Sequence, residues 1–364
     1  MSTLPVSDKG TYLYYEDTGP LERPYTTYIL VHGTAVHGAI FHRLLPFAQS
    51  KKLRLVLVNR RDYPGSSPIT DEELAPITPP NATNDTQAAF VRSRGVEIAE
   101  FLARFIREKD VPPVQHVDGR TIGGLALIGW SSANGTLAGM FGNLDAVRTE
   151  ARETVGPYLR NYIHFDGPRW ALGFPHLEPF SRPFANPDLT DDDRMVVFGE
   201  WVSAYYQHPF LSRASYARVP SDLTSDIPAN PPPDKVATFA RMSQEEKDGV
   251  LSRYALFHSE MRVRAIDPAV FKRNMLRAFF GDDGALMAWR DTRVQFLQCS
   301  ESLWETMSVM WEVESEYQRR RQAGDRKGRS MEFHLMRDAN HIPMWDQPER
   351  LLNKFIELVD GTNT

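Results

Sequence analysis

Residues 125–141 read LALIGWSSANGTLAGMF, and this stretch decides the fold. It opens with five apolar residues, as expected for a strand covered on both faces of a sheet, and Asn134–Phe141 has a helical pattern. Between them lies Gly129–Ala133 (GWSSA), a G-x-S-x-G motif with alanine in its last place. A serine at a sharp strand-to-helix turn needs small residues two positions to either side, because larger side chains collide where strand and helix cross. The stretch predicts that Ser131 occupies such a turn.

Further short apolar runs predict buried strands on either side of this stretch. They are Thr27–Val31, Leu53–Asn59, Tyr162–Asp166, Val294–Cys299 and Met331–Met336, with a more alternating edge strand at Thr11–Glu16. Helical patterns lie between them, notably at Thr86–Lys109, with Asp85 as its expected N-cap, and at Pro348–Val359. Strands that alternate with helices indicate an α/β fold, with a parallel sheet and helices on both faces.

The alternation stops between residues 167 and 290. This block has no clear strand pattern and is helical or irregular in character. It begins and ends inside the alternating pattern, so we interpret it as a helical cap inserted into one α/β unit rather than as a separate domain. In parallel sheets ligands bind at the carboxyl ends of the strands. We therefore expect the cap to cover Ser131.

Two loops follow strands at positions that suit catalysis by Ser131. His32-Gly33-Thr34 follows the strand Thr27–Val31 and can direct a backbone N–H toward the serine. The N–H of Ser132 would complete an oxyanion hole. Asp338-Ala339-Asn340-His341 follows the last predicted strand, and from this loop His341 can reach Ser131 as general base.

With these motifs the chain resembles the α/β-hydrolase-fold serine hydrolases. The loop Asn59–Ser67 (NRRDYPGSS) is similar to the family's D-x-R-G-x-G-x-S loop, and the order of Ser131 and His341 along the chain also fits. The resemblance covers about residues 10–166 and 291–360. It implies a mostly parallel eight-stranded sheet, built from residues 1–166 and 291–364, with the helical cap inserted at 167–290.

The resemblance also implies a covalent acyl-enzyme. Ser131 would attack a carbonyl, and His341 would take its proton and later activate water. The N–H groups of Thr34 and Ser132 would hold the oxyanion. We expect hydrolysis of a carboxylic ester, including lactones and thioesters; acyl transfer, carbon–carbon bond hydrolysis and ligand binding without turnover are the alternatives.

The triad acid stays open at this point. The family's usual place follows the seventh strand, but there VQFLQC runs into Ser300–Glu305 without an aspartate. Glu301 is closest in register, and Glu305 falls where a helix begins. Some members place the acid after the sixth strand, where Asp166 stands. Either strand can supply the carboxylate that fixes the histidine tautomer.

The cap and the strand-to-helix turn at Ser131, called the elbow here, supply the expected substrate contacts. The cap is rich in large apolar side chains, from which we select Trp201, Tyr205 and Phe279, together with Trp130 at the elbow. Such walls favour an apolar or aromatic acyl group in a small-molecule substrate.

The composition and the absence of certain motifs exclude several classes of protein. The 364 residues carry 42 lysines and arginines against 47 acidic residues, and the net charge of −5 gives no overall attraction for nucleic acid. Cys299 is the single cysteine, so no intramolecular disulfide forms. The sequence lacks a signal-peptide pattern, an apolar run of about 18 residues, and zinc or nucleotide-phosphate motifs. We expect a cytoplasmic enzyme without a membrane span, metal or cofactor; the oligomeric state stays open.

Overall fold

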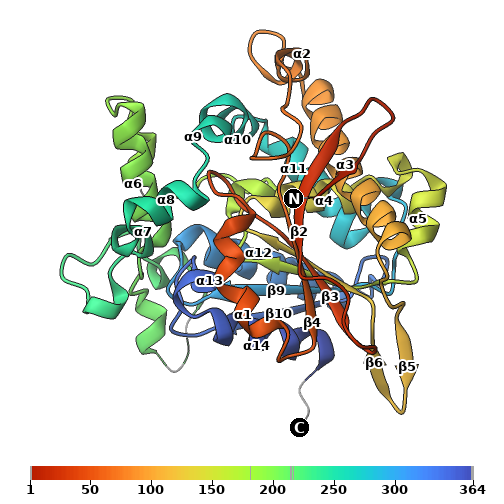
Figure 1. The fold of residues 1–364 in the computed structure, drawn as a ribbon. Helices are drawn as coiled ribbons and strands as arrows, with labels where there is room; N and C mark the ends of the chain where they lie inside the picture. Colours follow the sequence, from red (N-terminus) through yellow and green to blue (C-terminus); the bar gives the residue numbers. More distant parts are fainter. Residues whose placement is uncertain (1, 181, 214, 216, 362–364) are drawn as a thin grey trace.

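The computed structural model describes residues 2–180, 182–213, 215 and 217–361. Eight strands form one sheet in the order β1-β2-β4-β3-β7-β8-β9-β10. The pairs β1–β2 and β2–β4 are antiparallel. All pairs from β4 through β3, β7, β8 and β9 to β10 are parallel. The predicted mostly parallel, eight-stranded α/β sheet is therefore confirmed (Figure 1).

The predicted strands recur with small shifts at their ends. The sheet strands are β1 (Ser2–Pro5), β2 (Tyr12–Asp17), β3 (Thr26–Val31), β4 (Leu53–Val58), β7 (Leu125–Trp130), β8 (Leu159–Phe165), β9 (Arg293–Cys299) and β10 (Met331–Met336). A separate hairpin of β5 (Gln115–Val117) and β6 (Arg120–Ile122), like β1, was not predicted, because both are short and largely exposed.

Fourteen α-helices are assigned within the described residues. They are α1 (Leu45–Ala48), α2 (Asp71–Leu74), α3 (Asn84–Glu108), α4 (Ala133–Gly142), α5 (Thr149–Val155), α6 (Asp191–Ser203), α7 (Thr238–Arg241), α8 (Gln244–Val250), α9 (Arg253–Ala255), α10 (Met261–Arg264), α11 (Pro268–Met275), α12 (Trp304–Gln322), α13 (Pro343–Asp346) and α14 (Pro348–Asp360). The N-cap of α3 is Thr83 rather than Asp85, because the Thr83 and Thr86 side chains each bond the other's backbone N–H.

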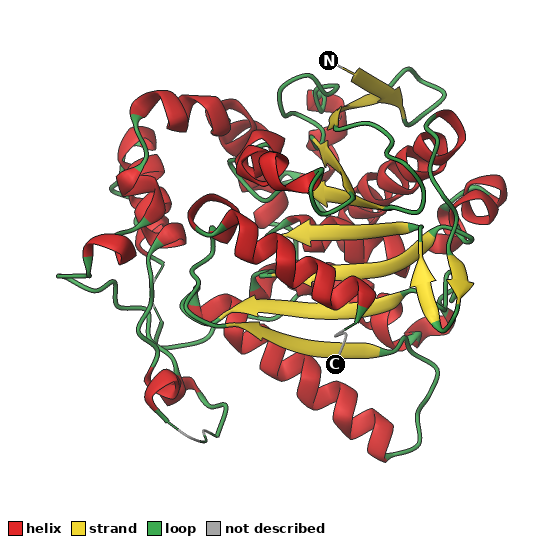
Figure 2. Ribbon diagram, turned by 60° about the horizontal axis from the view of Figure 1, so that its bottom comes forward, coloured by secondary structure: helices red, strands yellow, loops and turns green. Residues whose placement is uncertain are grey.

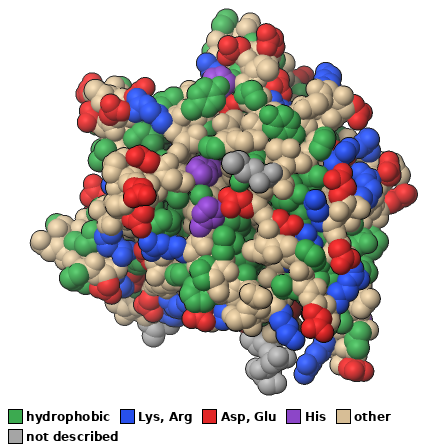
Figure 3. Space-filling view, in the orientation of Figure 1, with side chains coloured by type: hydrophobic (Ala, Val, Ile, Leu, Met, Phe, Trp, Pro, Cys, Tyr) green, Lys and Arg blue, Asp and Glu red, His purple; other side chains and the backbone are tan. Residues whose placement is uncertain are grey.

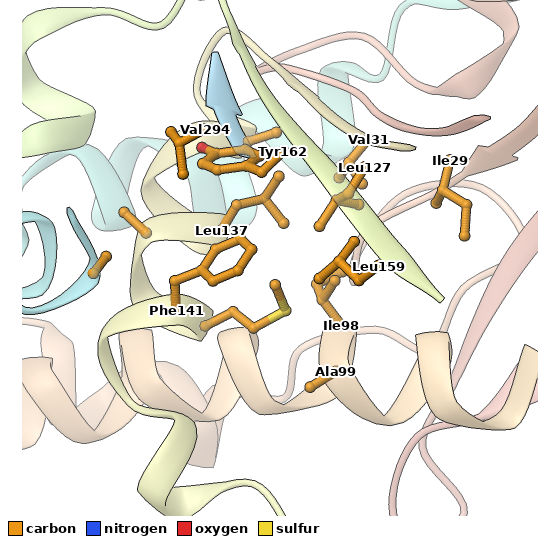
Figure 4. Close-up of a cluster of buried hydrophobic side chains, with 14 of the residues drawn as sticks. Ile29, Val31, Ile98, Ala99, Leu127, Leu137, Phe141, Leu159, Tyr162 and Val294 are labelled. Carbon is orange, nitrogen blue, oxygen red and sulfur yellow. The ribbon is translucent and has the colours of Figure 1, made fainter. Parts of the chain in front are cut away.

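Alternate residues of the central strands enter two different cores. In β7, Leu125 and Leu127 face one core, while Ala126 and Ile128 face the other. The first core packs against α3, α4, α5 and α12, and Figure 4 shows α3 and α4 side chains meeting strand residues there. The second core includes α14 and the 3₁₀ helix η1 (Gly38–Leu44). Burial on both faces explains the continuous apolar runs of these strands.

The chain between β8 and β9 forms no sheet strand within the described residues. Its helices α6 to α9 lie beyond the carboxyl ends of the parallel strands (Figures 1 and 2). Its last helices behave differently: α11 and the π-helical turn η10 (Leu276–Phe280) pack against α4. Met275, Phe279 and Phe280 belong to the same core as the central strands.

The surface carries both signs of charge. Figure 3 shows acidic and basic side chains interspersed over one face. Among the described residues, no helix combines the length and the apolar character needed to cross a bilayer.

Candidate active site

Ser131 lies at the turn between β7 and α4, as predicted. Its φ of 55° is in the left-handed region, which non-glycine residues rarely adopt. The backbone is held there by the Ser131 N–H bonding the Phe165 carbonyl at 3.0 Å and by Asn134 Nδ2 donating to the Ser131 carbonyl at 2.9 Å. A Cβ on Gly129 would lie 2.6 Å from Leu137 Cδ1, so the glycine is needed where strand and helix cross. The strained turn presents the Ser131 hydroxyl beyond the end of the sheet.

His341 meets the Ser131 hydroxyl from the loop after β10. Its Nε2 is 3.0 Å from Ser131 Oγ. The loop is anchored by the Trp130 indole, whose Nε1 donates to the His341 carbonyl at 3.0 Å. The His341 side chain is 1% exposed. A serine and an imidazole at this distance can exchange a proton directly.

Asp166 lies on the other side of the His341 ring. Its Oδ2 is 2.6 Å from His341 Nδ1. The same carboxylate accepts the Cys299 N–H at 3.0 Å and the Ser302 hydroxyl at 2.5 Å. These contacts fix the carboxylate against the imidazole and hold the Nδ1–H tautomer, which leaves Nε2 free to accept the serine proton.

The other two carboxylates considered for this place lie elsewhere. Glu301 Oε1 pairs with Lys235 Nζ at 2.5 Å. Glu305 pairs with Arg182 from the first turn of α12. Within the described residues neither carboxylate contacts the His341 ring, so of the three alternatives only Asp166 lies against it. The sequence could not select it, because the choice depends on how β8 and β10 lie across the sheet.

The loop after β3 lies directly beside the nucleophile. A Cβ on Gly33 would be 2.7 Å from Ser131 Cβ, so only glycine fits. Thr34 Oγ1 lies 2.8 Å from Ser132 Oγ, which brings these two residues together as expected. Ser132 is the N-cap residue of α4, and its N–H has no intrahelical acceptor. Thr34 and Ser132 therefore lie side by side next to the nucleophile, and the Ser132 N–H is not used by α4.

A buried ion pair supports this loop, and sequence reasoning missed half of it. Thr34 Oγ1 donates to Glu260 Oε2 at 2.7 Å, and Glu260 Oε1 pairs with Arg60 Nη2 at 2.8 Å. The one proton of the Thr34 hydroxyl goes to the carboxylate, so the Ser132 hydroxyl donates to Thr34. Arg60 lies in the Asn59–Ser67 motif, whereas Glu260 comes from the region between β8 and β9, where no motif marks it.

Arg60 also hydrogen-bonds to His32 and Gly33 and so holds the loop after β3 in place. Arg60 donates through Nε to the His32 carbonyl at 3.1 Å and through Nη2 to the Gly33 carbonyl at 3.0 Å. Burial, with the Arg60 charge, holds the pKa of His32 well below its usual value. Nε2 of the neutral ring then accepts a hydrogen bond from the backbone N–H of Arg60 at 3.1 Å.

Solved structures share this architecture. An esterase from Exiguobacterium antarcticum superposes over 99% of each chain with a TM-score of 0.50 at 12% sequence identity. The chain has the α/β-hydrolase fold. A carboxylesterase from Nitrososphaera gargenis (TM-score 0.49, 11% identity, 98% of this chain and 97% of that one) is also similar. So is an epoxide hydrolase mutant from Vigna radiata (0.48, 12%, 98% and 96%). Neither a family model nor a curated protein sequence matches the chain.

A cavity opens onto Ser131 in the expected place for this α/β-hydrolase fold. Thr34, Ser131 and Ser132 form its floor, and Trp201 also lines it. Further apolar side chains in its wall come from the chain between β8 and β9: Trp170, Phe184, Phe198, Leu256 and Met261.

The other expected substrate contacts are not among the residues that line this cavity. Phe279 is fully buried in the core against Tyr162 and Phe296. The Tyr205 hydroxyl donates to Asp346, and Trp130 supports His341 from behind. The structure corrects these three predictions: the aromatic side chains fill the core or brace loops, because composition cannot tell a pocket wall from the packing beneath it.

Proposed function

We propose that the protein is a serine hydrolase that cleaves a carboxylic ester, lactone or thioester through an acyl-enzyme on Ser131. The observation that carries this proposal is the hydrogen-bonded series Ser131–His341–Asp166, with distances of 3.0 Å and 2.6 Å, at a strained turn facing a cavity. A structural serine would need neither the imidazole nor the buried carboxylate behind it.

The geometry supports a two-stage reaction. Ser131 Oγ attacks the carbonyl carbon while His341 Nε2 takes its proton, and the N–H groups of Thr34 and Ser132 stabilise the oxyanion. The imidazolium then protonates the leaving oxygen or sulfur, which departs. Water, deprotonated by His341, attacks the acyl-enzyme. As the second oxyanion collapses, the imidazolium returns the proton to Ser131 Oγ, the ester bond to the serine breaks and the acid is released. Asp166 stays ionised throughout and stabilises the imidazolium.

The cavity wall favours an acyl group with apolar parts. Its aromatic and aliphatic side chains lose no hydrogen bond when they pack against such a group, and each Å² of apolar surface buried contributes about 25 cal/mol. An ester panel graded by acyl size tests this part. Preference for acetyl over every larger acyl group would contradict it.

The nucleophile is tested by labelling with a fluorophosphonate and mapping of the adduct. We expect the adduct on Ser131 and its loss in Ser131→Ala, with ester turnover reduced on the order of 10⁴–10⁶-fold and the fold intact. Ser308→Ala is the control, because the Ser308 hydroxyl bonds its own helix at the Glu305 carbonyl. An adduct on Ser132, or on no serine, would exclude the proposal. Product analysis with a competing alcohol separates hydrolysis from acyl transfer.

A further inference from the structure

Four charged side chains outside the proposed triad line the cavity: Arg194, Glu260, Arg264 and Glu305. Two of them, Arg264 and Glu305, have a buried polar atom without a partner among the described residues. Glu305 is fully buried, and its Oε2 has no hydrogen-bond partner among the described residues. The buried Arg264 Nη2 likewise has no acceptor within the described chain; the nearest carboxylate oxygen is Glu305 Oε1, 4.0 Å away. An unpaired buried donor is costly, and a ligand that pairs with it recovers that cost.

Within the described residues, the Arg264 guanidinium contacts aromatic rings rather than hydrogen-bond acceptors. Its guanidinium carbon lies 5.4 Å from the Trp170 ring centroid and 5.2 Å from that of Phe184. Both rings line the same cavity. Such stacking orients the planar guanidinium while its N–H edge stays available. Burial lowers the pKa of Arg264 to about 10, so the side chain is still charged at neutral pH.

The position of Arg264 follows from the chain before it. The π-helical turn η9 (Leu256–Glu260) leads directly into α10, which ends at Arg264. Glu260 and Arg264 are four residues apart, so they project on the same side of the helical path. Glu260 contacts the Thr34 hydroxyl at the floor of the cavity, and Arg264 lies one turn away on its wall.

The carboxylates near Arg264 have closer partners than Arg264. Glu260 is matched by Arg60, and Glu305 is matched by Arg182. Arg194, also in the wall, donates to the carbonyl groups of Phe184 and Leu189. The lining thus holds two arginines and two glutamates, but each glutamate has an arginine closer than Arg264. Arg264 keeps a buried donor for an anion in walls that are otherwise apolar, where a low dielectric strengthens the attraction.

We propose that Arg264 binds a carboxylate of the substrate, so that the ester cleaved at Ser131 carries an anionic group on the part that enters this cavity. The carboxylate matches the guanidinium edge in geometry and charge, and it takes up the free Nη2 donor. The apolar walls then accommodate the carbon chain between the carboxylate and the reacting carbonyl. This inference rests on the proposed function.

The test compares three matched series of aryl esters that differ in acyl chain length. The acyl chain ends in a carboxylate, a carboxamide or a methyl group. At the best chain length we expect kcat/KM for the carboxylate to exceed that of both neutral partners on the order of 10–100-fold. In Arg264→Gln this preference should disappear, and Arg264→Met should prefer the methyl-ended ester. Arg262→Gln, on the same helix but outside the cavity lining, should behave like the unmodified protein.

The outcome separates this inference from the proposed function. Labelling of Ser131 by a fluorophosphonate and hydrolysis of the methyl-ended esters should persist in both Arg264 variants, which also shows that they fold. If the fluorophosphonate does not label Ser131 in the unmodified protein, the proposed serine hydrolase function is wrong. If labelling is intact but no chain length favours the carboxylate, or if Arg264→Gln keeps the preference, the carboxylate subsite is wrong. A preference for the carboxamide would likewise overturn it.

Discussion

Replacing the Asp166 carboxylate by an amide examines the triad at the point that the sequence left open. In Asp166→Asn the side chain keeps its size, and its oxygen can still accept the Cys299 N–H, so the fold should survive. The NH₂ group, however, would face His341 Nδ1 at the present distance of 2.6 Å. Nδ1 would then have to accept, which moves the ring proton to Nε2. A protonated Nε2 cannot take the proton of Ser131.

The expected loss follows from this tautomer change together with the lost stabilisation of the imidazolium. We expect kcat to fall on the order of 10³–10⁴-fold, which corresponds to about 4–5 kcal/mol of transition-state stabilisation. The assay is steady-state hydrolysis of a neutral aryl ester, with circular dichroism as the check on folding.

The matched control is Glu301→Gln, the same chemical change at the carboxylate nearest the family's usual position. Glu301 pairs with Lys235, so kcat should stay within about 3-fold. Equal losses in the two variants, or a loss in Glu301→Gln alone, would refute the assignment of Asp166 to His341.

Two further predictions concern the oxyanion loop and the buried core. Glu260→Gln leaves the Arg60 guanidinium buried without its carboxylate, so we expect a loss of about 3 kcal/mol in unfolding free energy and roughly 10-fold in kcat as Thr34 loosens; unchanged denaturant midpoint and kcat would contradict it. Burial lowers the pKa of His164 to about 3 against 6.5 unfolded, so the unfolded chain takes up the proton first and stability should fall by about 2 kcal/mol between pH 7 and pH 5. The His164 ring stacks on Phe296, so a phenylalanine can take its place. In urea titrations His164→Phe should remove this part of the pH dependence of the unfolding free energy. An equally steep fall in unfolding free energy in the variant would show that His164 is not its source.

Local sterics made the nucleophile turn predictable. The small residues on either side of Ser131 are required by contacts within one strand–turn–helix unit, such as the one between Gly129 and Leu137. The strands were predictable for a similar reason, because burial on both faces leaves a continuous apolar run.

Contacts between distant segments could not be predicted from one sequence. Asp166 meets His341 across 175 positions, and Glu260 meets Thr34 across 226. Phe279 shows the same limit for packing. An aromatic side chain such as Phe279 suits a pocket wall. However, α11 and η10 pack against α4, and Phe279 is buried beside Phe296. Which face a helix buries depends on its neighbours in space.

The region between β8 and β9 packs in two ways, so some of its helices can be replaced by other sequences more easily than others. Asp166 directly follows β8, and Ser131 and His341 follow other strands, so the helices between β8 and β9 supply none of the proposed reacting groups. The helices α6 to α9 could diverge or be exchanged between relatives with the chemistry kept and selectivity altered. The chain from η9 onward could not, because Glu260 pairs with the buried Arg60, and Phe279 and Phe280 complete the core beneath α4. A natural or engineered graft of new specificity would therefore have its downstream junction before Leu256, where η9 begins.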